Sequence, residues 1–163
     1  GVTALREALA RPELIQTDEL PRPGGTPLPV RRVPAPSPRP AFLAHPRLRR
    51  TSPVSQFCVA AALEALGDDA ARVSAGELTL GLVCTVMNGG VRYSRRFYEE
   101  TLRDPVTASP LIFPETVFNA PASHLAAVLG STGPSYTLVG DQSGFAQGIV
   151  VAAEWLVNSP DLD

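Results

Sequence analysis

The order of hydrophobic and polar positions predicts helices that alternate with short buried strands. Apolar residues at helical spacing predict helices over 1–12, 52–66, 94–104, 119–130 and 143–157. Apolar runs of the β type predict strands within 77–90, closed by two glycines, and at 135–139. Helices alternating with buried strands predict an α/β layered fold.

The helix predicted at 52–66 has the most clearly marked ends. Ser52 is suited to the N-cap position, and Pro53 fits the first helical position, where its missing N–H costs nothing. Gly67 follows the last leucine and is expected to stop the helix. The sequence therefore predicts both the first and the last residues of this helix.

A proline-rich segment, 12–51, separates the first predicted helix from the rest. Ten of the seventeen prolines of the chain fall within 12–46. Such density excludes a regular helix or a central strand and favours an extended, polyproline-like path. The segment is expected to be a structural crossover, although a docking site for a proline-binding module has the same composition.

Composition excludes several classes of function. The chain has 163 residues, of which 44% are hydrophobic, and this is enough for one sizeable core. Its formal net charge is −2, so neither nucleic acid nor a membrane surface is an expected partner. The sequence shows no apolar run long enough to span a bilayer and no signal peptide, and a cytoplasmic protein is expected.

Neither a metal nor a cofactor is expected from the sequence. Cys58 and Cys84 lie in apolar contexts and lack the spacing of a zinc site or of a disulfide framework. Both are predicted to be buried thiols.

Candidate chemistry is concentrated in the stretch "GPSYTLVGDQSGFAQG", residues 133–148, which predicts a strand, a sharp turn and the start of a helix. Such a turn lies beside unpaired backbone N–H groups, where a nucleophile or an oxyanion is stabilised. Here the turn carries Gln142, whose carboxamide is not a nucleophile but donates and accepts hydrogen bonds. Gln142 is expected either to bind a carbonyl or carboxylate or to satisfy backbone groups of the turn.

The spacing of several short motifs resembles the N-terminal half of a β-ketoacyl synthase, a condensing enzyme of the thiolase superfamily. The segments "GLVCTVMNGG" and "SPLIFPETVFNAPASHLAAVLGSTGPSYTLVGDQSG" carry the resemblance, with the family's ordered positions at Ser109, Pro110, Pro114, Asn119, His124, Gly133 and Pro134. Gln142 stands nine residues after Gly133, where the family has its nucleophilic cysteine. The resemblance implies a thiolase-like layered fold, N-terminal half only, with 1–163 as one domain that is incomplete relative to the family.

The departures from the family are equally informative. Glutamine at the nucleophile position is typical of chain length factors, which are silent ketosynthase homologues, and of decarboxylating loading ketosynthases. The residues beside it in "VGDQSG" resemble the first class, which has an acid before the glutamine and a glycine two residues after it. The family's catalytic histidines come from its C-terminal half, whereas this chain has only His45 and His124. His124 is expected to be a packed or capped core residue.

The resemblance therefore implies a non-catalytic ketosynthase-like subunit, similar to a chain length factor, acting in polyketide or fatty-acid-type biosynthesis. No condensing activity is expected of the chain by itself. One alternative is a malonyl-carrier-protein decarboxylase in which Gln142 replaces the cysteine. Another is an independent half-domain with a pure binding role.

The resemblance also assigns pocket and partner surfaces. It places Met87 at the position that sets pocket depth, and Ile112 and Phe113 at the pocket wall nearest the dimer partner, although all three could equally fill the core. It implies pairing with an active ketosynthase subunit, as a hetero- or homodimer, through the strand 136–139.

An acyl carrier protein is a further candidate partner because of three arginines in one predicted helix. Arg92, Arg95 and Arg96 could attract an acidic surface, but Glu99 and Glu100 follow at helical spacing. A solvated helix face whose charges pair with one another is the expected alternative.

Overall fold

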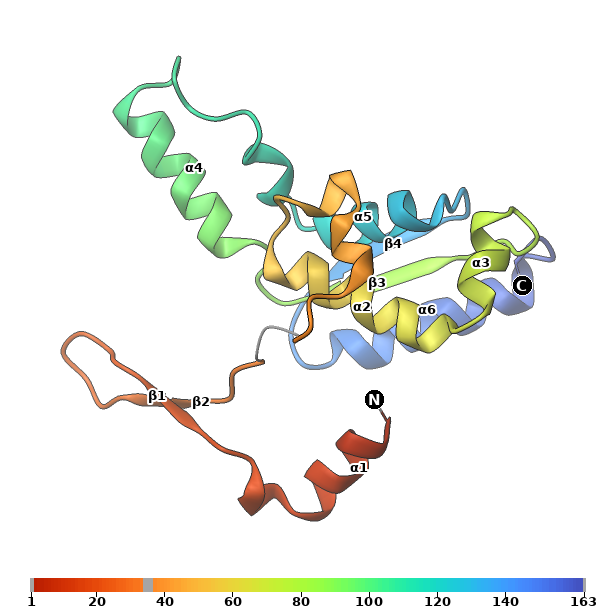
Figure 1. Ribbon diagram of the computed structural model, residues 1–163, viewed down its shortest axis with the longest axis horizontal. Coiled ribbons are helices and arrows are strands. Elements are labelled where there is room, and N and C mark those ends of the chain that lie inside the picture. The colour runs from red at the N-terminus through yellow and green to blue at the C-terminus, as the bar shows by residue number, and fades with distance from the viewer. Residues whose placement is uncertain (1, 34–36, 163) are drawn as a thin grey trace. The chain divides into compact units, whose positions relative to one another are not determined.

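The computed structural model describes residues 2–33 and 37–162, and the chain folds as two compact units, Gly1–Ala41 and Phe42–Asp163 (Figure 1). Residues 34–36, which belong to the predicted crossover segment, lie outside the described residues.

The first unit contains a helix and a small hairpin. Helix α1 (Val2–Ala10) ends before the 3₁₀ turn η1 (Pro12–Leu14), and strands β1 (Asp18–Leu20) and β2 (Leu28–Val30) then pair antiparallel. The extended path predicted for the proline-rich segment did not include this pairing. Pro29 is tolerated in it because a two-stranded hairpin consists only of edge strands, which can spare one N–H.

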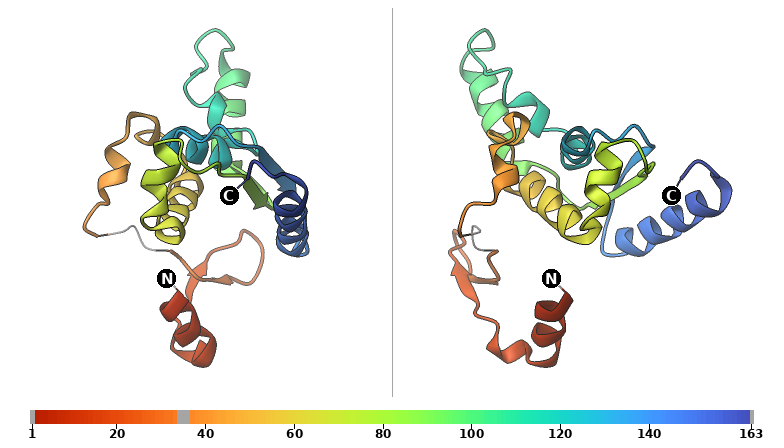
Figure 2. Two further views of the ribbon diagram at one scale, coloured as in Figure 1. Left: turned by 90° about the vertical axis from the view of Figure 1, so that its right-hand side faces the viewer. Right: turned by 45° about the vertical axis from the view of Figure 1, so that its right-hand side comes forward.

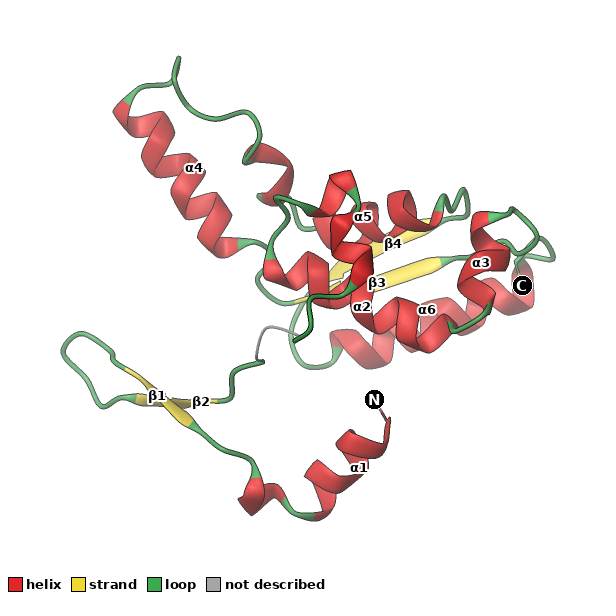
Figure 3. Ribbon diagram, in the orientation of Figure 1, coloured by secondary structure: helices red, strands yellow, loops and turns green. Residues whose placement is uncertain are grey.

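The second unit contains the remaining elements in the predicted order (Figure 3). They are η2 (Ala41–Ala44, which spans the unit boundary), η3 (Pro46–Leu48), α2 (Pro53–Leu66), α3 (Asp69–Ser74), β3 (Leu82–Val86), α4 (Val91–Arg103), η4 (Phe113–Glu115), α5 (Ala120–Leu129), β4 (Ser135–Val139) and α6 (Gly144–Asn158). The sequence did not predict α3.

Helix α2 begins and ends as its sequence predicts. The hydroxyl of Ser52 accepts a hydrogen bond from the N–H of Ser55 at 3.2 Å, and Pro53 occupies the first helical position. Gly67 adopts a φ of 53°, a conformation that favours glycine, and its N–H donates to the carbonyl of Leu63. Both cap predictions are confirmed.

The sheet of the second unit lies between two layers of helix. Strands β3 and β4 are parallel, with register from Leu82↔Ser135 to Val86↔Val139. Helix α6 covers one face, and α2 and α5 lie over the other (Figure 2). A Cβ on Gly148 of α6 would lie 2.8 Å from the Thr85 methyl group, so glycine lets α6 approach the sheet closely.

The core of the second unit lies on the α2 and α5 side of the sheet. Its buried members are apolar side chains that come from several elements, namely Leu43, Leu48, Val59, Val73, Leu125 and Leu129. The resulting mixed α/β structure agrees with the predicted fold class at this level. Among the helices in the described ranges, none combines the length and the apolar character needed to cross a bilayer.

Candidate functional site

Gln142 occupies the turn between β4 and α6, as the sequence predicts. The N–H of Gly140 donates to the carbonyl of Val86 at 3.2 Å, so the chain leaves β4 still attached to β3. Gln142 is exposed and lies two residues before α6 begins. The strand, turn and helix thus present the glutamine side chain at the N-terminal end of a 15-residue helix.

Asp141 stabilises the turn by accepting hydrogen bonds from Ser143. Its Oδ1 accepts hydrogen bonds from the hydroxyl of Ser143 at 2.6 Å and from the N–H of Ser143 at 2.8 Å. These bonds favour the ionised form, the hydroxyl contributing most, and they lower the pKa of the Asp141 carboxyl below its usual value. A fixed negative charge therefore stands next to Gln142.

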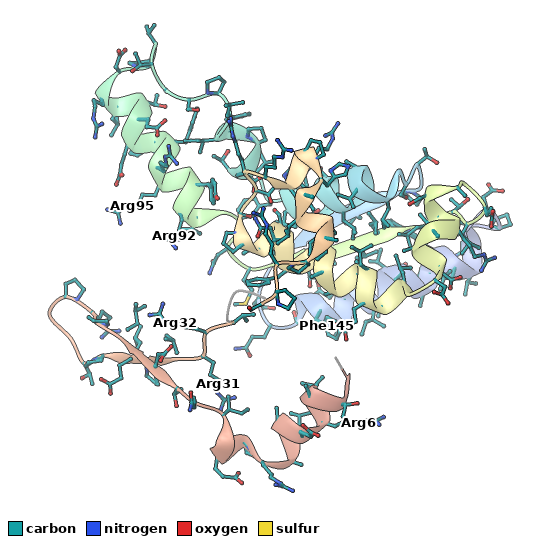
Figure 4. The ribbon with its side chains drawn as sticks, in the orientation of Figure 1. Arg6, Arg31, Arg32, Arg92, Arg95 and Phe145 are labelled. Carbon is teal, nitrogen blue, oxygen red and sulfur yellow. The ribbon has the colours of Figure 1, made fainter. Side chains whose placement is uncertain are left out.

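A cavity of about 250 Å³ opens beside the turn. Its lining comes from β3, β4, the turn and α6, and comprises Thr85, Val86, Met87, Leu138, Gly140, Asp141, Gln142, Gly144 and Phe145. Met87 and Phe145 are 59% and 70% exposed, so both present apolar surface at the mouth of this cavity (Figure 4 labels Phe145). The structure therefore brings Met87 together with Gln142, and adds Phe145, which sequence reasoning missed.

The other two predicted pocket residues lie elsewhere in the second unit. Ile112 is 6% exposed and packs in the interior. The ring of Phe113 lies 5.5 Å from that of Phe97, between centroids, and so joins η4 to α4. Neither residue lines the cavity at Gln142.

His124 belongs to a buried polar network that the sequence did not predict. Its Nε2 lies 2.5 Å from Oε1 of Glu115, whose side chain is only 3% exposed. The other oxygen, Oε2, accepts from the N–H of Ser52 at 2.7 Å and from the hydroxyl of Ser55. The prediction that His124 is a packed residue is confirmed, and the network joins the start of α2 to η4 and α5.

The arginines of α4 are partly occupied by partners on the same helix. Arg95 pairs with Glu99 at 2.7 Å and Arg96 pairs with Glu100 at 2.9 Å, each four residues apart. These pairs confirm the predicted self-paired helix face. Arg92 projects from the same helix (Figure 4) and lines a cavity of about 410 Å³ with Pro53, Tyr93 and Arg96.

The described residues contain no group of three or more histidine, cysteine, aspartate or glutamate side chains that could hold a metal ion. The side chains that line the Gln142 cavity include one carboxamide, one carboxylate and the hydroxyl-bearing Thr85.

Comparison with known proteins identifies the family. The model of the family described as "Beta-ketoacyl synthase, N-terminal domain" matches residues 34–157, which is more than half of the chain. The chain belongs to this family, and its mixed α/β structure is consistent with such a domain. A search of curated proteins returned no match.

Proposed function

We propose that this protein is a non-catalytic ketosynthase-like subunit, similar to a chain length factor, that pairs with an active ketosynthase in polyketide or fatty-acid-type biosynthesis. The observation that carries the proposal is the position of Gln142. It stands in the turn before α6, where the resemblance places the family's nucleophile, and a carboxamide cannot attack a thioester.

The apolar lining of the cavity supports a role as a pocket wall. Met87 and Phe145 stand beside Gln142 and present flexible and aromatic surface to the same small space. Side chains of this kind close off the depth available to an acyl chain. The pocket function is therefore attributed to Met87 and Phe145, with Ile112 and Phe113 proposed for a wall shared with a dimer partner.

Strand β4 supplies the proposed dimer edge. The carbonyl of Pro134 accepts from Leu82 of β3, and the N–H of Gly140 donates to Val86 of β3. Because successive residues of a strand point their backbone groups to opposite sides, Thr137 directs its N–H away from β3. Within the described ranges, β4 pairs only with β3, so its outer edge is open to another strand.

The substitution Thr137→Pro tests this edge. Proline removes an outward N–H and leaves the bonds to β3 in place, so dimer formation is expected to fall at least about tenfold in affinity, the equivalent of one or two lost hydrogen bonds. Sedimentation of the purified chain, alone and co-expressed with an active aromatic-polyketide ketosynthase, measures the association.

Thr137→Val serves as the matched control, because valine keeps the N–H and the strand preference, and it should associate like the unmodified chain. Circular dichroism confirms that both variants are folded. Undiminished association of a folded Thr137→Pro protein would contradict pairing through β4. A stable monomer that binds no ketosynthase would favour the independent binding role instead.

The alternative function is a malonyl-carrier-protein decarboxylase that uses the amide of Gln142 to hold the thioester carbonyl or the leaving carboxylate. The adjacent Asp141 argues against it. Its pKa is lowered, so it stays ionised at neutral pH, and its negative charge opposes the binding of a second carboxylate close by.

Incubation with malonyl carrier protein distinguishes the two functions. We expect no release of carbon dioxide above the uncatalysed rate, with the unmodified chain and Gln142→Ala giving the same result. Steady decarboxylation that is lost in Gln142→Ala would exclude the silent-subunit proposal. A separate measurement tests the acyl carrier protein as a second partner: the chain is added to fluorescently labelled carrier protein, and binding is followed by fluorescence anisotropy.

A further inference from the structure

A cavity lined by two arginines lies between the beginnings of α2 and α4. Its volume is about 410 Å³, and its lining comprises Pro53 from α2 and Arg92, Tyr93 and Arg96 from α4. Arg92 and Arg96 are four residues apart, so both side chains lie on one side of α4. Among the described residues, this cavity shares no lining residue with the cavity at Gln142.

Most hydrogen-bond donors of these two arginines have no acceptor in the protein. Arg92 is exposed (Figure 4) and makes no hydrogen bond or ion pair with another described residue. Arg96 donates from its Nε to Glu100 at 2.9 Å, which leaves its two terminal amino groups without a partner in the described ranges. Glu100 is itself engaged further, because its other oxygen accepts from the N–H of Ser109 at 3.1 Å. The cavity therefore presents two guanidinium groups with donors available to a ligand.

The position of this positive charge opposes the stability of α4. Arg92 is the second residue of the helix, and the first turn contains no acidic residue. The N-terminal end of a helix carries a partial positive charge, so a cation there is unfavourable and an anion is favourable. Residues that break a local rule of this kind are expected at functional sites. An anion in the cavity would offset the unfavourable interaction.

Further positive charge precedes the other wall of the cavity. Arg49 and Arg50 stand four and three residues before Pro53, and both are exposed and unpaired with respect to the described part of the chain. The sequence contains no acidic residue between Glu19 and Glu64. The second unit as a whole is acidic, with eight arginines against twelve acidic residues. A local excess of positive charge in an acidic unit suits a small anion, whereas nucleic acid requires an extended basic surface.

The walls of the cavity are attached to each other. The hydroxyl of Tyr93 donates to the carbonyl of Thr51 at 3.4 Å, which joins α4 to the segment before α2. Pro53 begins α2 with a backbone φ that its ring fixes. Gly90, directly before α4, lies against the backbone oxygen of Glu115. A site whose backbone is already in place loses little free energy to ordering when a ligand binds.

We propose that this cavity binds the phosphate group of a small organic phosphate ester. A phosphate ester dianion offers three acceptor oxygens, so it can bridge the guanidinium groups of Arg92 and Arg96, whereas one arginine fork satisfies a carboxylate. The volume leaves room for an organic group beside Tyr93 and Pro53. The site is independent of the proposed pairing function, because it uses neither β4 nor Gln142.

Isothermal titration calorimetry of the full chain with phenyl phosphate tests the site. At slightly alkaline pH, where the ester is a dianion, we expect saturable binding of one phenyl phosphate per chain that weakens as salt is added. Benzoate, which carries a carboxylate on the same ring, should bind much more weakly. Equal binding of benzoate, the absence of saturable binding at millimolar concentrations, or tighter binding of a phosphoserine peptide would each overturn the proposal.

Variants on α4 separate a specific site from a general effect of charge. Arg92→Ala should weaken the binding of phenyl phosphate at least about tenfold, because it removes one of two charged donors. Arg92→Lys keeps the charge without the planar fork and should recover only part of the affinity. Arg95→Ala is the matched control, since it removes the same charge from the same helix outside the cavity lining, and it should bind almost as tightly as the unmodified chain. Equal losses in Arg92→Ala and Arg95→Ala would contradict the site.

Thermal unfolding gives a second readout that a structural role would not produce. Because Arg92 is exposed and its charge opposes the helix dipole, unliganded Arg92→Ala should unfold at a temperature equal to or higher than that of the unmodified chain. Phenyl phosphate should raise the unfolding temperature of the unmodified chain and leave that of the variant unchanged. A lower unfolding temperature for the unliganded variant would assign Arg92 to the stability of α4 and overturn the proposal.

Discussion

Replacing Glu115 by alanine is expected to lower the free energy of unfolding by about 2–5 kcal/mol, because it leaves buried polar groups without their acceptor at about 1–3 kcal/mol each. The substitution leaves the N–H of Ser52 and the ring of His124 without their acceptor, and the hydroxyl of Ser55 keeps only the hydroxyl of Ser52 as a partner. These groups lie at the start of α2 and within α5, whose packing forms much of the core. Urea denaturation followed by circular dichroism measures the loss.

Two further substitutions calibrate this result. Glu115→Gln keeps one acceptor oxygen but turns an N–H₂ group toward a donor. Its free energy of unfolding should therefore fall by less than that of Glu115→Ala. Glu99→Ala breaks only an exposed pair and should leave the unfolding midpoint unchanged. A loss below about 1 kcal/mol for Glu115→Ala would show that the network does not hold the two helices.

The turn that presents Gln142 could be predicted from the sequence because its signals are local. Glycine and aspartate interrupt an apolar strand, and an apolar helix follows directly, so the residue at the turn is identified by position alone. The caps of α2 are local in the same sense, since Ser52 and Gly67 act on backbone groups within four residues. Such features depend on short-range geometry and need no knowledge of the fold.

The contacts around Glu115 and around the Gln142 cavity could not be predicted in this way. Glu115 meets Ser52, which lies 63 residues earlier in the chain, through a 3₁₀ turn whose direction no local pattern fixes. Met87 and Phe145 line one cavity only because α6 packs against β3, which the pattern of either segment alone does not show. The same reason explains why Phe145 was missed at the cavity beside Met87.

Substituting Gly90 by alanine is expected to lower the free energy of unfolding of the second unit by about 1–3 kcal/mol or more, which is the range for forced overpacking. Gly90 has an ordinary φ of −83°, so the constraint is space and not backbone conformation. A Cβ there would lie 2.0 Å from the backbone oxygen of Glu115, and backbone cannot move aside as a flexible side chain can. The start of α4 would then have to move away from η4. This movement would also disturb the contact between the rings of Phe97 and Phe113.

Gly140→Ala provides the matched control, because a Cβ at Gly140 meets no atom within 4 Å and its φ lies outside the left-handed region. It should unfold at nearly the same urea concentration as the unmodified chain, whereas Gly90→Ala should unfold at a clearly lower one. Equal midpoints for the two variants would mean that α4 is not held against Glu115. If the two midpoints differ, Gly90→Ala should lower the free energy of unfolding by less when Glu115→Ala is already present. Residues 90 and 115 are in contact, and the effects of substitutions at contacting positions are not additive.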